Sequence, residues 1–292
     1  MKKAVLIGSN GQLGTELTKL WQKLPGASTS ELIGLMHENF DITDRRQVAT
    51  AVGELRPGVV INTAGFLRVD ECERLPDHAM LVNGIALKYV AEACVENGAM
   101  LVHFSTDYVF DGEKGTAYLE TDPVAPINAY GVSKLAGEQF VRYGLPVDHL
   151  IVRTSGLYGP AGSASKGVNF IETMLRLATE GKSLAVVDDQ VFSPSYAPDL
   201  AASVLKLIDA GGRGTFHITN AGSTSWYGLA GRAFELAGVK PELRPVSTAE
   251  YGAPARRPRY SVLDNARAQS AGLPATRAWE DALAEYMAVR GA

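Results

Sequence analysis

The sequence predicts an α/β protein built on a Rossmann-like, doubly wound parallel sheet, with a smaller C-terminal lobe. Three observations predict this fold. Short apolar strands alternate with amphipathic helices up to about residue 150, which is the rhythm of a parallel sheet covered by helices on both faces. The strand segments are continuously apolar, as is typical of strands buried on both faces. A glycine-rich turn joins the first strand to the first helix.

The first unit of this alternation is a strand, a turn and a helix at the N-terminus. The apolar run at 3–8 predicts a strand, and Leu13, Leu17 and Leu20 recur at helical spacing to form one apolar stripe. Further strands are expected at 31–37, 58–65, 99–107 and 149–154, and helices at 44–55, 78–98 and 133–141.

The rhythm loosens beyond about residue 155, where loops separate single helices that are expected at 169–180 and 198–210. There is no internal repeat and no Gly/Ser linker to mark a clean boundary. We therefore expect one domain at 1–155, whose sheet can recruit later segments, and a mixed α/β lobe at 156–292.

Composition excludes several classes of partner and location. The formal net charge is −4, so no basic surface field invites nucleic acid or an anionic membrane. No apolar run reaches the ~18 residues that span a bilayer, and the N-terminal run AVLI is too short for a signal peptide. Cys72 and Cys94 have neither metal-ligand nor CxxC spacing. We therefore expect a cytoplasmic protein with reduced thiols and no metal site.

The turn from Gly8 to Gly14 has the pattern G-x-x-G-x-x-G between an expected strand and an expected helix. Glycines let backbone N–H groups approach a pyrophosphate, and the helix N-terminus adds partial positive charge. A tight turn without a ligand is the alternative. The strand–turn–helix context favours a dinucleotide site.

A tyrosine and a lysine stand four residues apart in NAYGVSKLAGE, on one face of an expected helix. Thr106 lies at the end of an expected strand, where ligands bind in open α/β sheets. A neighbouring ammonium lowers the pKa of a phenol from about 10. Tyr130 and Lys134 can therefore act as an acid–base pair in carbonyl reduction, with Thr106 hydrogen-bonded to the same oxygen. Two polar residues on one helix face, and a threonine that caps a turn, are the alternatives.

The glycine spacing resembles that of the extended short-chain dehydrogenase/reductase superfamily, and this resemblance implies a cofactor site. Asp41 and Ile42 match the element near the adenine, and Ala64 and Gly65 match the loop beneath the cofactor. The cofactor residues implied are Gly8, Gly11, Gln12, Leu13, Gly14, Asp41, Ile42, Ala64, Gly65, Tyr130 and Lys134. Neither an acid nor an arginine ends the second strand. NADH and NADPH therefore both stay open, and the missing acid favours NADPH or dual use.

A more specific resemblance extends across nearly the whole chain. The segments are, in order, GQLG, STDYVFDG, YLETDPVAPINAYGVSKLAGE, VVDDQVFSPS, SWYGLA and PARRPRYSVLD. Together they resemble the dTDP-4-dehydrorhamnose reductase family. The resemblance implies NAD(P)H-dependent reduction of the C4 ketone of a dTDP-linked 6-deoxyhexose, with dTDP-4-dehydro-L-rhamnose as the expected substrate. It assigns NAD(P) to the domain at 1–155 and the sugar nucleotide to the lobe at 156–292.

The same resemblance implies roles for individual residues. Tyr130 would donate the proton, Lys134 would lower its pKa and hold the nicotinamide ribose, and Thr106 would align the ketone oxygen. The substrate residues implied are Thr106, Asp107, Tyr108, Asn169 and Arg257. Asn169 can instead be an N-cap. Arg257 stands in the family motif, and a guanidinium is suited to clamp a diphosphate.

Departures from the family pattern leave the sugar open. Gly156 stands where the family usually has a Trp that packs on the sugar, and Phe192 replaces a Gly in a nearby loop. Phe192 could rebuild the sugar wall from another direction, or the pair could change which sugar fits. Some family members bind Mg²⁺ at a subunit interface. Glu16 matches one such position but cannot carry Mg²⁺ by itself, and a homodimer stays open.

Two rival functions stay open at this level. The fold family includes a non-catalytic NADP-binding regulatory subunit of methionine adenosyltransferase, and binding proteins can keep ancestral residues. The intact Thr106, Tyr130 and Lys134 favour an enzyme. A reductase or epimerase of another nucleotide sugar is the second rival, which Gly156 and Phe192 keep open.

Overall fold

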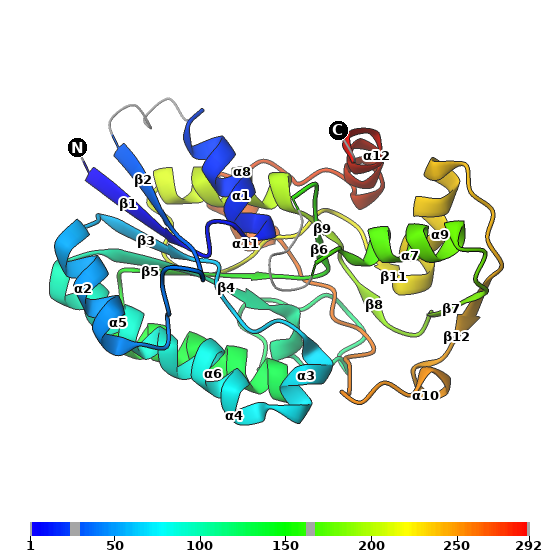
Figure 1. The fold of residues 1–292 in the computed structure, drawn as a ribbon, viewed down its shortest axis with the longest axis horizontal. Coiled ribbons are helices and arrows are strands. Elements are labelled where there is room, and N and C mark those ends of the chain that lie inside the picture. The colour runs from blue at the N-terminus through cyan, green and yellow to red at the C-terminus, as the bar shows by residue number, and fades with distance from the viewer. Residues whose placement is uncertain (1, 24–29, 162–166, 291–292) are drawn as a thin grey trace.

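Strands alternate with helices through the first half of the chain in the computed structural model, which describes residues 2–23, 30–161 and 167–290 (Figure 1). The strands of this half are β1 (Lys2–Ile7), β2 (Ser30–Leu35), β3 (Val59–Asn62), β4 (Met100–Thr106) and β5 (His149–Thr154). The helices are α1 (Gln12–Trp21), α2 (Arg45–Leu55), α3 (Val69–Arg74), α4 (Pro76–Met80), α5 (Ala86–Asn97) and α6 (Ala129–Gly144). A π-helical turn (Leu81–Ile85) joins α4 to α5, and a 3-10 turn (Asp107–Val109) follows β4.

Six parallel strands form the central sheet in the order β10-β5-β4-β3-β1-β2, where β10 is Gly214–His217. Every neighbouring pair is parallel, so all carboxyl ends lie along one edge. After β1 the chain adds β2 on one side and β3 on the other. This reversal marks the position where open α/β sheets bind ligands. The predicted doubly wound parallel sheet is confirmed.

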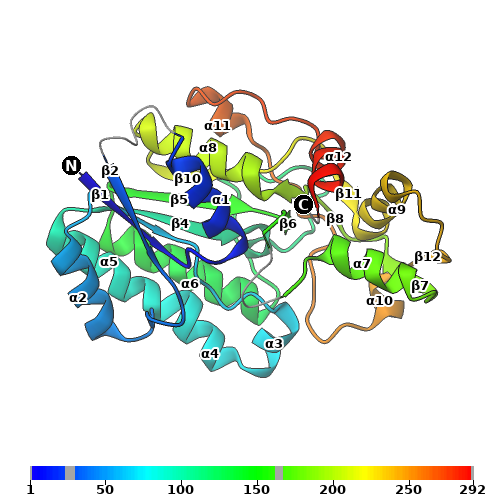
Figure 2. The same ribbon diagram turned by 45° about the horizontal axis from the view of Figure 1, so that its top comes forward.

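Helices cover both faces of the sheet and enclose two cores (Figure 2). On one face, α1, α8 (Ala197–Asp209) and α11 (Ala266–Ser270) pack over a core that includes Leu6 and Val204. On the other face, α2, α5 and α6 pack over a core that includes Val5. Val5 and Leu6 are neighbours on β1 and are both fully buried. Because successive strand residues point to opposite faces, one continuous apolar run supplies both cores.

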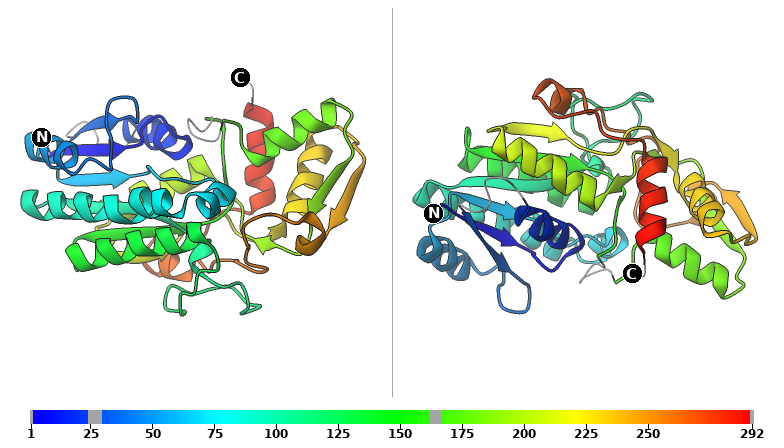
Figure 3. Two further views of the ribbon diagram at one scale, coloured as in Figure 1. Left: turned by 60° about the horizontal axis from the view of Figure 1, so that its bottom comes forward. Right: turned by 90° about the horizontal axis from the view of Figure 1, so that it is seen from above.

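The second half of the chain adds a smaller lobe beside the central sheet (Figure 3). Its strands are β6 (Leu157–Tyr158), β7 (Leu184–Val187), β8 (Val191–Phe192), β9 (Ser195–Tyr196), β11 (Thr224–Ser225) and β12 (Leu243–Val246), and its helices are α7 (Phe170–Thr179), α9 (Trp226–Ala237), α10 (Thr248–Tyr251) and α12 (Trp279–Val289). The strands pair two by two, as β6 with β9, β7 with β12 and β8 with β11. A separate apolar core lies among α7, α9 and α12.

The observed elements agree with most of the expected ones, with two differences. The helix expected at 78–98 is interrupted by the π-helical turn, and α6 begins at Ala129, four residues before the expected start. The sheet takes β10 from the second half, so the division at residue 155 stays a prediction. In the described part of the chain, no helix combines the length and apolarity needed to cross a bilayer.

Helix α6 packs closely because two of its glycines face backbone oxygens. A Cβ on Gly131 would collide with the oxygen of Tyr108, and a Cβ on Gly137 with the oxygen of Asn83 in the π-helical turn. The side chain of Asn128 caps the helix by accepting from the Gly131 N–H at 2.7 Å. These contacts hold α6 against the end of β4 and against the π-helical turn.

We expect Gly137→Ala to destabilise the protein by about 1–3 kcal/mol, because the added methyl forces α6 away from the π-helical turn. Gly53 on α2 is the matched control, since a Cβ added there would have no atom from outside its own helix within 4 Å. Gly53→Ala should leave stability unchanged or raise it by up to ~1 kcal/mol. Urea unfolding measures both variants, and equal midpoints would contradict the close packing.

Candidate active site

The glycine-rich turn lies at the carboxyl end of β1 and leads directly into α1. The Gly8 N–H donates to the Leu35 carbonyl at the end of β2, at 2.8 Å. The Thr63 hydroxyl, just after β3, donates to the carbonyl oxygens of Ile7 and Gly8. Side chains at Gly8 and Gly14 would collide with the surrounding backbone, and Gly8 has a φ of +82°. The turn therefore requires glycine at both positions.

The first turn of α1 fits a pyrophosphate. Gly11 is its N-cap residue and makes no side-chain cap, whereas Asp44 at the start of α2 accepts from two backbone N–H groups. Uncapped N–H groups beside a glycine turn are suited to a phosphate anion, so the residues present fit a dinucleotide. Of the other predicted turn residues, Leu13 is buried in the core and Gln12 Nε2 lies 3.5 Å from the Gly159 carbonyl.

The remaining predicted cofactor residues lie in loops that follow β2 and β3. Asp41 is exposed, and hydrogen bonds from the hydroxyl and N–H of Thr43 hold its pKa below the usual value. Ile42 is buried in the core. Ala64 and Gly65 follow β3 at the carboxyl edge of the sheet. The contacts of all four with the cofactor stay predictions.

Thr106, Tyr130 and Lys134 come together at the carboxyl end of β4. The buried Lys134 side chain reaches back along α6 and donates from Nζ to the Phe104 carbonyl at 2.6 Å. The Tyr130 phenol has the Thr106 hydroxyl as a hydrogen-bonding neighbour. The Tyr108 ring meets Tyr130 edge to face, with ring centroids 5.9 Å apart. The strand end and the helix predicted from the sequence therefore do converge.

Burial sets the protonation of this pair. It raises the pKa of Tyr130 above its usual value, although the Thr106 hydroxyl opposes this shift. It lowers the pKa of Lys134 to about 8, and the negative charge of Glu138 opposes that shift. At neutral pH the site therefore holds a neutral phenol and an ammonium on one helix, and the neutral phenol can give up a proton. The pKa of Tyr130 lies above its usual value in this structure, so the lowering that was expected from Lys134 is not seen.

Asp107, a predicted substrate residue, is buried and accepts hydrogen bonds from three hydroxyls. Thr106 Oγ1 donates to it at 2.9 Å, Ser155 Oγ at 2.7 Å and Ser261 Oγ at 2.6 Å. Burial raises the pKa of the carboxyl, and the three hydroxyls oppose that shift. The carboxylate orients the Thr106 hydroxyl and ties the end of β4 to Ser155, directly after β5, and to Ser261 in the second half. Neither Ser155 nor Ser261 was predicted from the sequence.

Arg257 reaches from the second half of the chain to the first. Its Nη2 lies 3.0 Å from both carboxylate oxygens of Asp70 on α3, and its Nη1 donates to the Ala255 carbonyl at 3.0 Å. Tyr108 is a further hydrogen-bonding neighbour of the guanidinium. A guanidinium carries five N–H donors, and the contacts with Asp70, Ala255 and Tyr108 account for at most four of them. Asp70 was not predicted from the sequence.

Two other predicted residues are engaged in local structure. Asn169 caps α7 by accepting from the Glu172 N–H at 3.0 Å and donates to Tyr286 Oη at 2.9 Å. This arrangement is the N-cap alternative, and a nucleotide contact stays a prediction. Glu16 is buried and pairs with Lys19 at 2.9 Å. Among the described residues, no three His, Cys, Asp or Glu side chains gather as metal ligands would.

Gly156 and Phe192, the two departures from the family pattern, are in contact. Gly156 has a φ of +53°, and a Cβ there would collide with the Phe192 ring. Phe192 is 3% exposed and packs on Trp226, with ring centroids 4.2 Å apart. Phe192 therefore occupies the space that a side chain at position 156 would need. Because Phe192 is itself almost fully buried, it offers little surface to a bound sugar.

Two buried polar contacts that hold α6 were not predicted from the sequence. The Asn83 amide donates to Ser133 Oγ at 3.0 Å and accepts from the Phe66 N–H at 2.8 Å, which joins α6 to the loop after β3. Glu138, fully buried on α6, forms a two-pronged ion pair with Arg153 on β5 at 2.8 Å for each contact. A polar residue within an apolar helix or strand segment is the signal that could have found them.

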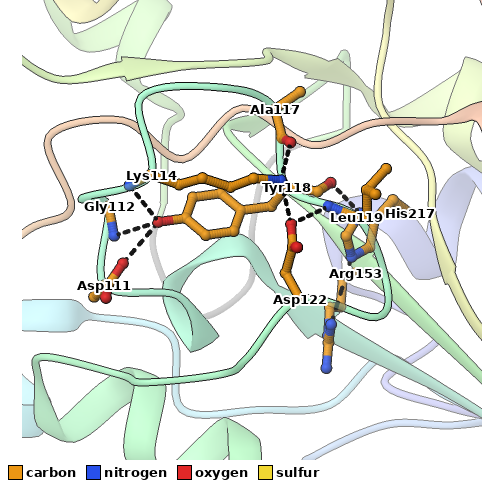
Figure 4. A network of polar contacts seen from close by, with 9 residues as sticks. All are labelled: Asp111, Gly112, Lys114, Ala117, Tyr118, Leu119, Asp122, Arg153 and His217. Carbon is orange, nitrogen blue, oxygen red and sulfur yellow. Dashed lines mark hydrogen bonds and ion pairs between the residues drawn. The ribbon is translucent and has the colours of Figure 1, made fainter.

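From Arg153, the partner of Glu138, a polar network reaches the loop after β4; Figure 4 shows this network from Arg153 onward. Arg153 Nη1 lies 3.5 Å from His217 Nε2, and His217 Nδ1 lies 3.0 Å from the Tyr118 carbonyl. A histidine that donates from Nδ1 and faces an arginine at Nε2 must be neutral, and burial lowers its pKa to about 3. The Tyr118 hydroxyl in turn donates to Asp111 at 2.7 Å.

Comparison with models of known protein families shows which family this chain belongs to. The model of the RmlD substrate binding domain matches residues 1–290. The chain belongs to this family.

Relatives within the family are similar over nearly the whole chain. A dTDP-4-dehydrorhamnose reductase from Streptomyces griseus is 42% identical over 96% of this chain and 91% of the relative. A dTDP-4-keto-6-deoxy-D-glucose reductase from Streptomyces niveus is 39% identical over 96% and 95%. The solved structure of the Bacillus anthracis dTDP-4-dehydrorhamnose reductase with NADP is 40% identical, with a TM-score of 0.90 and 99% of each chain covered. The chain is therefore an NAD(P)-dependent dTDP-sugar reductase of the RmlD family.

The burial of Lys134 predicts a pH dependence of stability. An unfolded lysine has a pKa near 10.4, and the folded value is about 8, so the folded state binds fewer protons between these values. The free energy of unfolding should therefore rise with pH in this window, by up to about 3 kcal/mol relative to Lys134→Met. Urea unfolding of both proteins at pH 7.5, 9 and 10.5 measures this difference. A pH-independent difference would contradict the burial of a charged lysine.

Proposed function

We propose that this protein reduces the C4 ketone of a dTDP-linked 6-deoxyhexose with NADH or NADPH, and that dTDP-4-dehydro-L-rhamnose is its substrate. The observation that carries the proposal is the convergence of Thr106, Tyr130 and Lys134 at the carboxyl edge of the sheet, the edge that also carries the glycine-rich turn. Lys134 is fixed by the Phe104 carbonyl, and Tyr130 has Thr106 as its neighbour. The names of the full-length relatives support a dTDP-sugar as the substrate class.

The side chains supply the proton for this reaction. A dinucleotide held at the glycine-rich turn would supply the hydride for the carbonyl carbon. Tyr130 gives its proton to the carbonyl oxygen as the alcohol forms, and the phenolate regains a proton from solvent. Lys134, with its positive charge, would stabilise that phenolate. The Thr106 hydroxyl donates its proton to Asp107 in this structure, and it would turn that proton to the ketone oxygen to hold the oxygen in line. The raised pKa of Tyr130 favours the protonated starting state that a reduction needs.

The identity of the sugar depends on the region around Gly156. Phe192 is buried against Trp226 and fills the space that a side chain at Gly156 would need, so Gly156 would meet the sugar without a side chain. A second candidate is dTDP-4-keto-6-deoxy-D-glucose, because a relative of similar identity carries that name. Both substrates have a C4 ketone and use the same proton donor.

Tyr130→Phe should lower the rate of NADPH or NADH oxidation with dTDP-4-dehydrorhamnose by at least ~100-fold, because no group then protonates the oxygen. Absorbance at about 340 nm follows the reaction. Tyr143→Phe is the matched control, since Tyr143 lies on the same helix and is 88% exposed. Its rate should equal that of the wild type.

Two outcomes would contradict the proposed function. Tight dinucleotide binding without oxidation by any dTDP-4-ketosugar would favour the regulatory alternative. Turnover that survives in Tyr130→Phe would remove Tyr130 from the proton donor's role. Comparison of the two candidate ketosugars as substrates, at matched concentration, separates rhamnose synthesis from reduction of another sugar.

Arg257→Lys should raise the KM for the nucleotide sugar by about tenfold with little change in kcat, because an ammonium cannot hold Asp70 and a diphosphate in one plane. Arg256 is the matched control, since it is the preceding residue and its side chain is exposed. Arg256→Lys should leave KM unchanged. Equal KM values for both variants would show that Arg257 only ties the second half of the chain to α3.

A further inference from the structure

Glu38 lies beside the glycine-rich turn although it follows the predicted end of the second strand. β2 ends at Leu35, and Glu38 stands three residues later in an exposed loop. Asn10, inside the turn, places its Nδ2 3.1 Å from both carboxylate oxygens of Glu38. The residues are 28 positions apart, so only the fold brings the carboxylate to the turn.

The backbone fixes this neighbourhood. The N–H groups of Gly8 and Ser9 both donate to the Leu35 carbonyl, at 2.8 and 3.3 Å. A Cβ on Gly34 would collide with the Ser9 side chain, so the end of β2 lies directly against the turn. Glu38 therefore stands at the carboxyl ends of β1 and β2, on the side of the turn away from β3, β4 and the catalytic residues.

This position is where a dinucleotide bound across the turn places its adenosine ribose. With the pyrophosphate at the start of α1, the adenosine half extends toward β2 and the nicotinamide half toward β4. A carboxylate at this place accepts a hydrogen bond from a ribose 2′-hydroxyl and repels a 2′-phosphate. The two contacts from Asn10 leave further lone pairs on the Glu38 oxygens.

The charges of the surrounding loop also disfavour a 2′-phosphate relative to a 2′-hydroxyl. Residues 36–44 include Glu38, Asp41 and Asp44 and contain neither lysine nor arginine. His37 is the one basic side chain of that loop and lies near Asp41. The first arginine after it, Arg45, forms an ion pair with Glu92 on α5 at 3.1 Å. A 2′-phosphate would therefore meet net negative charge here.

We propose that Glu38, held by Asn10, selects NADH over NADPH. The inference rests on the proposed dinucleotide site and deepens it by naming the residue that distinguishes the two cofactors. It differs from the expectation drawn from the second strand, which left both cofactors open and favoured NADPH or dual use. The acid lies one residue beyond the segment expected to form that strand, and Asn10 draws it back to the turn.

Isothermal titration calorimetry with NADH and NADPH tests the proposal without any turnover. Wild type should bind NADH about tenfold more tightly than NADPH at low salt, and Glu38→Gln should remove most of that preference by strengthening NADPH binding. Glu38→Arg should reverse the preference. Because the group is exposed, added salt should reduce the discrimination by the wild type.

Glu31→Gln is the matched control. Glu31 is exposed at the amino end of β2, the strand that Glu38 follows. The variant therefore makes the same change in net charge far from the turn and should keep the wild-type ratio of NADPH to NADH dissociation constants. An unchanged ratio in Glu38→Gln, or tighter binding of NADPH than NADH by the wild type, would overturn this inference alone. Failure of the wild type to bind either dinucleotide would overturn it together with the proposed cofactor.

Discussion

A single buried carboxylate, that of Glu138, constrains much of the structure. A fully buried anion is stable only when it is paired and hydrogen-bonded. Arg153 meets this need with two contacts at 2.8 Å, and Arg142 adds a third at 2.8 Å. Because Glu138 lies one helical turn after Lys134, the Glu138–Arg153 ion pair holds α6 against β5 close to Lys134. The charge of Glu138 also opposes the loss of the ammonium that burial of Lys134 favours.

The contacts that extend from this pair join the two halves of the chain around one site. Arg153 leads through His217 on β10 to the loop that contains Tyr118. The Tyr118 backbone is hydrogen-bonded to Val262, next to Ser261, which donates to Asp107. The carboxyl end of β4 is therefore braced on one side by α6 and on the other by the second half. These contacts fix the position of Thr106 at the end of β4.

Much of the fold and part of the site could be predicted because their signals are local. The glycine turn is defined within seven residues by the conformation that only glycine adopts there. A spacing of four places Tyr130 and Lys134 on one helical face wherever that helix lies. The interruption of the expected helix at the π-helical turn was not predicted. It depends on Gly137 of α6 meeting the backbone of Asn83, a contact across 54 positions of sequence that no local pattern encodes.

The sequence by itself determined the order of strands and helices, the parallel sheet, the nucleotide turn and the tyrosine–lysine pair. Each follows from the spacing of neighbouring residues, which sets local geometry directly. Only the tertiary structure decided that Asp107 is enclosed by hydroxyls, that Arg257 is paired with Asp70, and that Phe192 fills the space beside Gly156. It also decided that Glu38 returns to the turn. Those pairings join residues far apart in the chain, and burial and charge select them only once the sheet has brought their segments together.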